Sequence, residues 1–593
     1  MHDRSYSPLD APNPTYLWAR LLVEELGRSG VTTFFVAPGS RSTPLTVAAA
    51  RHPDAEVVLH VDERGTAFAA LGYGRVHDAP AAWITTSGTA VANGHPAVVE
   101  AATDGVPMML LTADRPPELR DTGANQTVDQ VKVFGDHVRY FVDVPPPSDD
   151  VDPAYVLTTA DQAVHRAQRV PPGPVHLNCG FRKPLEPVPQ QTSIDVPRAV
   201  SDWAEDTAPY TKYPPSVETP SDAALDRLVD AVADLQRGLV VVGRLDRPDD
   251  ADAVCRLAQH LGWPLVPALT SRLRLGEGDE AVRIPYADLA LTSEALQEVG
   301  QPEAVLQLGG RFTAKRLRLF LRDAAPSVWA VVRPDPSRID PDHRTTHHIE
   351  AHVAPFVDAV DQRVGPSAEA TDWTAGWRAA DAAARSEVDR HAEEGGLTEP
   401  AVATHLTQHI PSSHALVAAS SMPVRDLNRH ACADGAPVPV VANRGASGID
   451  GTVATTAGVA RALDRPATLL IGDLALWHDL NSLALLSEQP IVVVVINNDG
   501  GGIFHFLPIE AHEDVFEPHF TTPQGRTFEG AADTFGLAYR RPDTVEAFQE
   551  AYREACDRAG PSLIEVHTDR SENREVHEQL ERKIAAAVDA VVG

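Results

Sequence analysis

The stretch from residue 468 to residue 504 constrains the fold of this 593-residue chain more than any other. It reads TLLIGDLALWHDLNSLALLSEQPIVVVVINNDGGGIF. Residues 468–471 and 491–496 are short apolar runs, and the second is β-branched throughout, as in parallel strands covered on both faces. The leucines between 476 and 486 give a helix one apolar face. The stretch therefore predicts a strand–helix–strand unit of a parallel α/β sheet.

Polar side chains follow both predicted strands. Asp473 comes after the first, and Asn497, Asn498 and Asp499 come after the second, before three glycines. Because the carboxyl ends of parallel strands meet at one edge, these oxygens are expected to converge beside the start of a helix. Carboxylate and amide oxygens suit Mg²⁺, and a helix start suits a diphosphate. An ordinary turn built from Asp, Asn and Gly fits the same pattern, so both readings stay open.

The order GD, helix, hydrophobic strand and NN resembles the diphosphate- and metal-binding motif of thiamine diphosphate enzymes. The chain departs from that motif at Leu474, where the family usually carries Gly. The resemblance implies that Mg²⁺ or Mn²⁺ is held by Asp473, by the Asn498 side chain and by the Gly500 carbonyl. It also implies that thiamine diphosphate contacts Gly472, Asp473 and Leu474.

Composition limits the class of protein. A chain of this length is expected to form about three domains of roughly 150–200 residues. The net charge of −32 argues against nucleic acid as a partner. Apolar runs recur throughout, which argues against disorder, and so acidic a folded chain is typical of a high-salt cytoplasm, as in a halophilic archaeon. Four scattered cysteines form neither a metal spacing nor a disulfide framework.

No run is long and apolar enough to span a bilayer, and the first residues, MHDRSYSPLD, lack the core of a signal peptide. We therefore expect no membrane partner and a cytoplasmic location.

The first third predicts a doubly wound domain. Helices are expected at 15–27 and 66–75, and strands are expected at 31–36, 56–61, 81–86 and 107–112. The domain closes around residues 173–184. Arg41 follows the first strand. An arginine in this position is most often a solvated surface residue, and the more specific interpretation is that its guanidinium binds an anion. Glu63 follows the second strand. A glutamate in this position most often only supplies a negative charge to the N-terminus of the next helix.

The segments APGSRSTPLT, HVDERG, TTSGTAVAN and LTADRPPELRDTGANQ resemble the pyrimidine-binding domain of a family of menaquinone-pathway synthases, the 2-succinyl-5-enolpyruvyl-6-hydroxy-3-cyclohexene-1-carboxylate synthases. The resemblance implies that Glu63 is catalytic and hydrogen-bonds the aminopyrimidine, with Gln126 beside the ring. A carboxyl group is needed because protonation of the ring favours the imino tautomer, whose nitrogen then removes the thiazolium proton. The implied substrate-binding residues of this domain are Ser40, Arg41, Arg115 and Asn125.

The middle of the chain begins with residues 186–222, which are rich in Pro, Ser, Thr and Asp and predict a long surface linker. A second α/β domain follows, with a helix at 223–236 and strands near 239–242, 264–268, 304–308 and 328–332. It carries no dinucleotide fingerprint. Lys315 follows a Gly-Gly pair; it is either a surface charge or, as the resemblance implies, a residue at the substrate entrance. A helix-rich acidic segment at 374–394 leads into the last domain.

The final third contains further strand ends with polar loops. The predicted strands 415–419 and 438–442 run into SSMPVRD and NRGASGIDG. A helix at 545–557, a strand at 562–566 and a closing helix at 568–593 complete it. The resemblance extends here, with Ser420 and Met422-Pro423 as departures. It implies substrate contacts at Ser421, Arg425 and Arg444, a cofactor contact at Ile449, and apolar pocket positions at Phe504 and Leu507.

Together these patterns predict an α/β protein with three doubly wound parallel-sheet domains, at 1–185, 223–365 and 366–593. The resemblance implies decarboxylation of 2-oxoglutarate and conjugate addition of the succinyl unit to isochorismate. Both substrates are dianions, so a cluster of cations is required. The cluster would comprise Arg41, Arg115, Arg425, Arg444 and Lys315. The resemblance further implies a homodimer or homotetramer with active sites between subunits.

Two alternatives remain from the sequence. One is another thiamine diphosphate enzyme, such as an acetohydroxyacid synthase or a 2-oxoacid decarboxylase; the arginine-rich loops argue against a small neutral acceptor. The other is a non-catalytic regulator that binds a diphosphate cofactor on the same fold. The presence of Glu63 argues against it.

Overall fold

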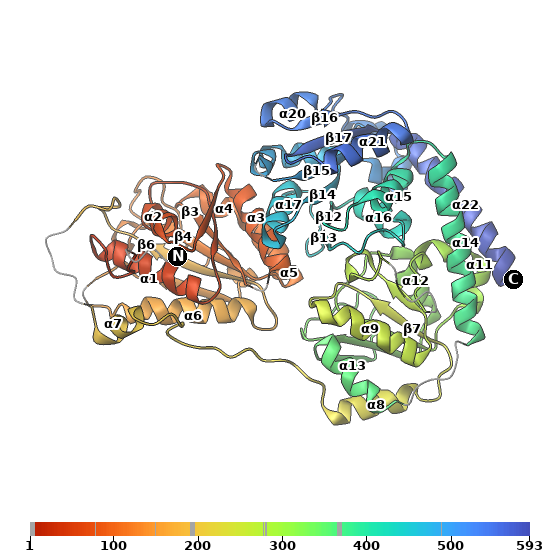
Figure 1. The fold of residues 1–593 in the computed structure, drawn as a ribbon, viewed down its shortest axis with the longest axis horizontal. Helices are drawn as coiled ribbons and strands as arrows, with labels where there is room; N and C mark the ends of the chain where they lie inside the picture. Colours follow the sequence, from red (N-terminus) through yellow and green to blue (C-terminus); the bar gives the residue numbers. More distant parts are fainter. Residues whose placement is uncertain are drawn as a thin grey trace. The chain divides into compact units, whose positions relative to one another are not determined.

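The computed structural model describes residues 6–77, 79–148, 150–189, 196–276, 278, 282–364, 371–487 and 489–593. These residues contain three sheets, and every strand pair in them is parallel (Figure 1). The chain divides into two compact units. The first comprises Met1–Pro215, Asn443–Asp464 and Trp477–Gln489; the second comprises Ser216–Ala442, Arg465–Leu476 and Pro490–Gly593. The prediction of three parallel α/β sheets is confirmed.

The first unit is built on a six-stranded sheet in the order β2-β1-β3-β4-β6-β5. Apolar strand residues on one face pack against α1 and α6, while Trp83 on the other face donates a hydrogen bond to Thr66 of α3 at 2.9 Å. The sheet is therefore covered by helices on both faces. Its strands are β1 (Thr33–Val36), β2 (Glu56–Leu59), β3 (Ala81–Thr85), β4 (Met108–Asp114), β5 (Tyr140–Val144) and β6 (Pro174–Gly180). Its helices are α1 (Pro14–Arg28), α2 (Thr43–Arg51), α3 (Glu63–Val76), α4 (Thr89–Asn93), α5 (His95–Asp104), α6 (Ala154–Gln168) and α7 (Arg198–Ala204).

A helix from late in the chain, α17 (Thr452–Leu463), packs tightly against α3 within this unit. The contact depends on one glycine from each helix. A Cβ at Gly72 would lie 2.2 Å from the Thr455 carbonyl oxygen, and one at Gly458 would lie 2.0 Å from the Ala69 carbonyl oxygen. Larger residues would push the helices apart, so these glycines permit the close approach of the two backbones.

The prediction of a surface linker at 186–222 is wrong for residues 198–204. They form the helix α7, and Val200 and Trp203 of α7 are buried in the core of the first unit. The Trp203 indole N–H donates to Glu25 at 2.7 Å, and the Arg28 guanidinium lies 4.0 Å from the Trp203 ring centre. The hydrogen bond and the cation–π contact of Trp203 explain why a segment with the composition of a linker is anchored to the first unit. Residues 190–195 of the segment lie outside the described residues.

The second unit contains two sheets. The five-stranded sheet has the order β11-β10-β9-β7-β8 and the six-stranded sheet has the order β13-β12-β14-β15-β17-β16. The first is made of β7 (Gly238–Val242), β8 (Leu265–Pro267), β9 (Ala304–Leu308), β10 (Val328–Arg333) and β11 (His347–Glu350). The second is made of β12 (Ala415–Ala418), β13 (Val440–Ala442), β14 (Ala467–Gly472), β15 (Ile491–Asn497), β16 (Ala538–Arg540) and β17 (Ser562–His567).

Helices of the second unit cover these sheets. On the five-stranded sheet, α9 and α13 pack on one face, and α12, α14 and the C-terminal α22 pack on the other. On the six-stranded sheet, α15, α16 and α21 pack on one face. Their bounds are α8 (Asp222–Val232), α9 (Pro248–Leu261), α10 (Ala287–Ala290), α11 (Glu294–Val299), α12 (Lys315–Ala324), α13 (Val353–Asp361), α14 (Asp372–Glu394), α15 (Glu399–His409), α16 (Met422–His430), α19 (Glu513–Phe516), α20 (Glu529–Phe535), α21 (Val545–Cys556) and α22 (Arg570–Val592).

The helix predicted between β14 and β15 is broken into two pieces. The structure has α18 (Asp473–His478) and then a 3₁₀ segment, η4 (Leu480–Leu486). Asp479 separates them with φ −116°, and its carboxylate accepts hydrogen bonds from the Val453 and Ala454 N–H groups and from Ser482. The side chain thus caps α17 instead of continuing a helix. The chain also passes from the second unit to the first at residue 477.

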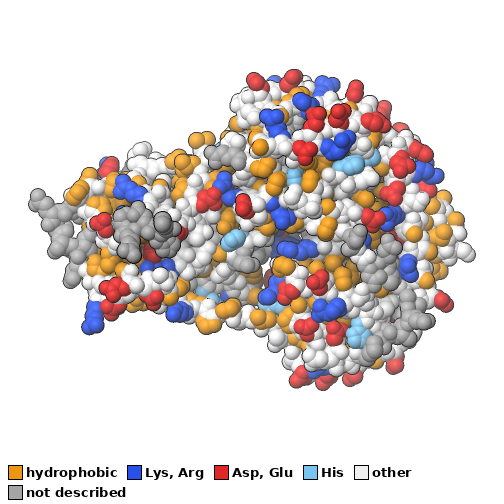
Figure 2. Space-filling model, in the orientation of Figure 1, with side chains coloured by type: hydrophobic (Ala, Val, Ile, Leu, Met, Phe, Trp, Pro, Cys, Tyr) orange, Lys and Arg blue, Asp and Glu red, His pale blue; other side chains and the backbone are white. Residues whose placement is uncertain are grey.

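Acidic side chains gather on the surface over α8 and α13 in the view of Figure 2. These helices carry Asp222, Asp226 and Asp230, and Asp358 and Asp361. None of the described helices combines the length and the apolar character that a bilayer crossing requires.

Asp381 on α14 gives a test of this fold through the pH dependence of stability. The side chain is buried, it accepts a hydrogen bond from the Tyr286 N–H at 2.6 Å, and burial raises its pKa from 3.8 to about 7. The folded chain therefore holds a proton that the unfolded chain releases, so stability is lost as the pH rises from about 4 through about 7. From pH 5 to pH 8 we expect the free energy of unfolding of Asp381→Asn to rise by about 3 kcal/mol relative to that of the wild type. Denaturant unfolding at both pH values measures it.

A matched control is Glu394→Gln, an exposed acid on the same helix. Its difference from the wild type should stay constant across the two pH values. A constant difference for Asp381→Asn as well would contradict the prediction.

Candidate cofactor and substrate site

The predicted metal ligands converge at the carboxyl edge of the six-stranded sheet of the second unit. β14 and β15 pair in register from Ala467 opposite Ile491 to Gly472 opposite Ile496, which places Asp473 beside Asn497 and Asn498. The Asp473 carboxylate accepts hydrogen bonds from the Gly500 N–H at 2.7 Å and from the Leu474 N–H at 2.8 Å. The strand–helix–strand pattern therefore brings together the three residues that the sequence singles out as metal ligands.

The electrostatics of this cluster suit a cation. Asp473 is only 3% exposed, and burial, with added repulsion from Asp499 and Glu399, raises its pKa to about 7. The buried Asn498 Oδ1 has no hydrogen-bond partner among the described residues, while its Nδ2 donates to Glu399 at 2.9 Å. A buried carboxylate and a free amide oxygen are a donor set that Mg²⁺ or Mn²⁺ satisfies. The residues present thus fit the metal that the motif implies.

The loop after β15 is held in one conformation. Gly500 has φ +142°, and a Cβ there would lie 2.2 Å from the Thr521 carbonyl oxygen, so only glycine fits. The Asp499 carboxylate accepts from the Gln524 and Gly525 N–H groups, and Arg570 donates to the Asn498 and Asp499 carbonyl oxygens. The backbone at Gly500 is therefore preorganised before any ligand arrives.

Glu399, at the start of α15, is a functional residue that the sequence patterns did not reveal. Its carboxylate is buried and accepts from Asn498 Nδ2 at 2.9 Å and from Thr568 Oγ1 at 3.1 Å. The first bond fixes the amide so that its oxygen faces away from Glu399. Because Glu399 lies 99 positions from Asn498 and reads as an ordinary first-turn acid after Thr398, no local signal distinguishes it.

Replacement of Glu399 by Leu removes the acceptor and leaves the Asn498 amide free to rotate. We expect Mg²⁺ to support thiamine diphosphate binding with about 10- to 100-fold lower affinity, the range found for partners that orient a metal ligand. Calorimetric titration of the cofactor at several Mg²⁺ concentrations measures it. Glu399→Gln keeps an acceptor oxygen and should stay close to the wild type. Equal Mg²⁺ dependence in the Leu variant would argue against this role.

Glu63 lies in the first unit as the first residue of α3, after the N-cap residue Asp62. Its side chain is half-buried, and Glu63 Oε2 accepts a hydrogen bond from Asn93 Nδ2 at 3.2 Å. Asn93 ends α4 and comes from the TTSGTAVAN segment. Glu63 is thus oriented by a neighbouring loop, and part of its carboxylate remains open to a ligand.

Other predicted residues gather at the carboxyl edge of the six-stranded sheet of the first unit. Gln126 Nε2 donates to the Ser87 carbonyl oxygen at 2.9 Å, and Arg115 donates to Ser87 Oγ and to the Asn125 carbonyl oxygen, each at 2.7 Å. Arg41 is buried and donates to the Phe181 carbonyl oxygen at 2.8 Å; burial, with the nearby Arg115 charge, lowers the Arg41 pKa. Two guanidinium groups therefore lie close together, as an anionic ligand requires.

Ser40 is exposed on the loop before α2. Its carbonyl oxygen accepts a hydrogen bond from Thr43 Oγ1 at 2.7 Å.

The NRGASGIDG loop is held by Glu100, another residue that the sequence patterns did not reveal. The buried Glu100 carboxylate accepts hydrogen bonds from three successive N–H groups, at Gly445, Ala446 and Ser447, at 2.6–3.1 Å. Arg75 pairs with the same carboxylate at 3.0 Å. Arg444 and Ile449, the two predicted contact residues on this loop, are half-buried in the first unit.

The second unit contains a cavity of about 1220 Å³ that brings Lys315, Arg425 and Leu507 together. Lys315 begins α12, Arg425 lies on α16, and Leu507 is exposed after the 3₁₀ turn η5 (Gly502–Phe506). Arg425 donates to the Ser421 carbonyl oxygen, and Ser421 itself has φ +74° at the start of α16. Non-glycine residues with such dihedral angles concentrate at functional sites.

Phe504 lies on η5 beside this cavity, and its ring contacts the Phe520 ring edge-on at 5.5 Å. The predicted residues thus form two groups. The group in the first unit comprises Ser40, Arg41, Glu63, Arg115, Asn125, Gln126, Arg444 and Ile449. The group in the second unit comprises Lys315, Ser421, Arg425, Gly472, Asp473, Leu474, Asn498, Gly500, Phe504 and Leu507.

Three family models match the chain. A model of a "Thiamine pyrophosphate enzyme, N-terminal TPP binding domain" matches residues 18–133. A "Middle domain of thiamine pyrophosphate" model matches residues 195–417, and a "Thiamine pyrophosphate enzyme, C-terminal TPP binding domain" model matches residues 430–566. The first match contains Glu63 and Gln126, and the third contains Asp473, Asn498 and Gly500.

Curated relatives match over almost their whole length. The 2-succinyl-5-enolpyruvyl-6-hydroxy-3-cyclohexene-1-carboxylate synthase of Salinibacter ruber is 64% identical over 99% of this chain and 100% of its own. The synthases of the same name from Rubrobacter xylanophilus and Chlorobium phaeobacteroides are 55% and 40% identical, each over 97% of this chain. The chain therefore belongs to the thiamine diphosphate enzymes, in the family of the 2-succinyl-5-enolpyruvyl-6-hydroxy-3-cyclohexene-1-carboxylate synthases.

Proposed function

We propose that this protein decarboxylates 2-oxoglutarate and adds the resulting succinyl unit to isochorismate, giving carbon dioxide and 2-succinyl-5-enolpyruvyl-6-hydroxy-3-cyclohexene-1-carboxylate for menaquinone biosynthesis. The observation that carries the proposal is the full-length likeness to synthases of that name, 64% identical in the first relative. The buried Asp473 beside the free Asn498 amide oxygen supports the cofactor part of it.

The chain's residues have separate tasks toward the cofactor. Asp473, the Asn498 side chain and the Gly500 carbonyl would hold Mg²⁺ or Mn²⁺, and Gly472, Leu474 and Ile449 would contact the cofactor. Bound thiamine diphosphate supplies the carbanion and the electron sink for the decarboxylation. Glu63 would hold and return the proton at the aminopyrimidine nitrogen, with Gln126 beside the ring.

Both substrates carry two negative charges, so cations must hold them in an acidic protein. Arg41 and Arg115 would supply positive charge from the first unit, with Arg444 on its glycine-rich loop. Lys315 and Arg425 would supply it from the cavity of the second unit. Oriented guanidinium groups grip carboxylates in pairs, which positions the substrates as well as attracting them. The remaining proposed contacts are Ser40, Asn125 and Ser421, and the apolar Phe504 and Leu507.

The proposal includes an assembly. The working enzyme would be a homodimer or homotetramer with active sites between subunits, in which Glu63 of one chain serves the diphosphate site of another. It also includes the domain limits 1–185, 223–365 and 366–593, which remain predictions. The cytoplasmic location that the sequence predicts is also part of the proposal.

A carbon dioxide release assay at high salt tests the reaction. The mixture contains 2-oxoglutarate, thiamine diphosphate and Mg²⁺, with and without isochorismate. Release that depends on isochorismate, with a succinylated ring product, is the expected result. Equal release without isochorismate would instead identify a plain 2-oxoacid decarboxylase. Tight cofactor binding without any release would point to the non-catalytic regulator.

A further inference from the structure

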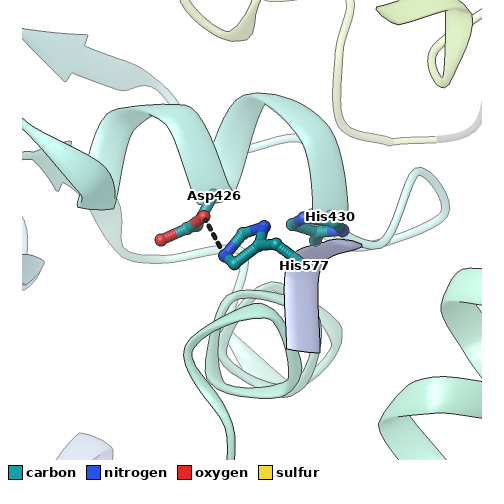
Figure 3. A group of neighbouring side chains, drawn as sticks. All are labelled: Asp426, His430 and His577. Carbon is teal, nitrogen blue, oxygen red and sulfur yellow. Dashed lines mark ion pairs between the residues drawn. The ribbon is translucent and has the colours of Figure 1, made fainter. Parts of the chain in front are cut away.

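Three titratable side chains meet in the second unit, apart from the Asp473 cluster. Asp426 and His430 lie one turn apart on α16, and His577 reaches them from α22 (Figure 3). All three are buried, with exposures of 2%, 1% and 2% in that order. One ligand atom from each residue lies within 4.8 Å of the others, and His577 Nε2 is 3.3 Å from Asp426 Oδ1.

Their polar atoms lack partners. Among the described residues, both ring nitrogens of His430, both of His577 and Oδ1 of Asp426 make no hydrogen bond. His577 Nε2 and Asp426 Oδ1 form an ion pair, dashed in Figure 3, but no hydrogen bond. Buried polar atoms almost always find a hydrogen-bond partner, so three side chains that face one another with atoms that make none indicate a missing ligand.

Charged groups of both signs surround the cluster. Glu399 lies close enough to act electrostatically on Asp426 and supplies a second carboxyl group nearby. Arg429 on the same helix lies close, but its guanidinium bonds Asp288 at 3.0 Å and approaches Glu581 at 3.5 Å. Those two acids offset part of its charge, which also acts on His430 and His577, as does that of His391. Arg425, which also faces Asp426, lies on the cavity side of α16.

We propose that Asp426, His430 and His577 form a metal site that binds one divalent transition-metal ion of the zinc type. Two imidazoles and one carboxylate are the ligand set such ions prefer, in contrast to the oxygen-only set around Asp473. Two ligands of one tetrahedral zinc ion lie about 3.3 Å apart, which is the Asp426–His577 separation. Only His430 has to move closer.

The chemistry of the ligands supports this site. Both imidazole rings are buried and none of their nitrogens makes a hydrogen bond to the described residues, so each ring has a nitrogen available for a metal. His577 also lines the cavity of the second unit, so a water molecule from that cavity can complete the coordination.

The site has a structural consequence. The ion would tie the C-terminal α22 to α16, the helix that carries Arg425 next to Asp426. It would thereby fix the position of a guanidinium at the cavity. The metal site itself does not depend on the proposed function, and its test uses no turnover measurement.

The experiment is a titration of the full chain, without a histidine tag, with Co²⁺ in the presence of saturating Mg²⁺ and thiamine diphosphate. Saturation keeps the Asp473 site occupied, and tetrahedral Co²⁺ bound by nitrogen and oxygen absorbs visible light. We expect one equivalent of Co²⁺ per chain to give this absorption, and Zn²⁺ to displace it. His430→Gln and His577→Gln should each lose the absorption.

The matched control is His414→Gln. His414 is a buried histidine of the same unit whose Nδ1 already pairs with Thr468 Oγ1 at 3.1 Å, so it should keep the full absorption. Wild-type protein that binds no Co²⁺ and whose melting temperature is unchanged by Zn²⁺ would overturn the proposal, whatever the variants do. Full absorption in both cluster variants would also overturn it.

Discussion

Glu63→Gln should reduce isochorismate-dependent carbon dioxide release by about 10²- to 10⁴-fold, the usual contribution of a positioned proton-transfer group. Glutamine fills the same volume and still accepts a hydrogen bond from Asn93, as Glu63 does at 3.2 Å. It cannot exchange a proton with the aminopyrimidine. Cofactor affinity, measured by calorimetry, should therefore change little while turnover falls, because the lost interaction acts in proton transfer and not in ground-state binding.

The control for this variant is Glu118→Gln. Glu118 lies in the same unit, is half exposed, and pairs with Arg182 at 2.6 Å. It should keep wild-type turnover. A Glu63→Gln enzyme with unchanged turnover would refute the catalytic assignment, whereas a joint loss of turnover and cofactor binding would assign Glu63 to binding.

Asp473→Asn should weaken Mg²⁺-dependent thiamine diphosphate binding by more than about 100-fold, since residues that merely orient a metal ligand contribute about 10- to 100-fold. The variant keeps an acceptor for the Gly500 N–H but loses the charge that faces the metal. Calorimetric titration at fixed Mg²⁺ measures the change.

The same substitution should have the opposite effect on stability without metal. Burial raises the pKa of Asp473 to about 7, so at pH 8 the folded chain carries a buried charge that the unfolded chain solvates freely. Metal-free Asp473→Asn should therefore melt higher than metal-free wild type at pH 8, and the gap should close as the pH falls below about 7. Asp514→Asn, an exposed acid on α19, should show neither effect. A lower melting temperature for metal-free Asp473→Asn would contradict this account.

The strands that the sequence predicts and those that it misses differ in position within the sheets. The predicted strands are apolar runs, such as β15 (Ile491–Asn497), which is buried along its whole length. Four strands were not predicted: β5, β6, β11 and β16. β6 falls in residues 173–184, which were expected only to close the first domain, and it is buried between β4 and β5. The other three, β5, β11 and β16, lie at the edges of their sheets and carry polar or half-exposed residues. An edge strand has one neighbour and partial solvent exposure, so its pattern lacks the apolar continuity that identifies a central strand.

The sequence by itself determined the parallel α/β class and the meeting of Asp473, Asn498 and Gly500, the proposed metal ligands, at one sheet edge, because both follow from short-range patterns. Apolar runs set the strands, and the residues directly after them lie at one sheet edge whatever the rest of the chain does. Only the tertiary structure decided the partners that hold those residues. Glu399 and Glu100 bond backbone or side-chain groups 99 and about 345 positions away, and His577 meets Asp426 across two helices. Such contacts depend on how whole elements pack, and packing of distant elements leaves no periodic trace in the local sequence.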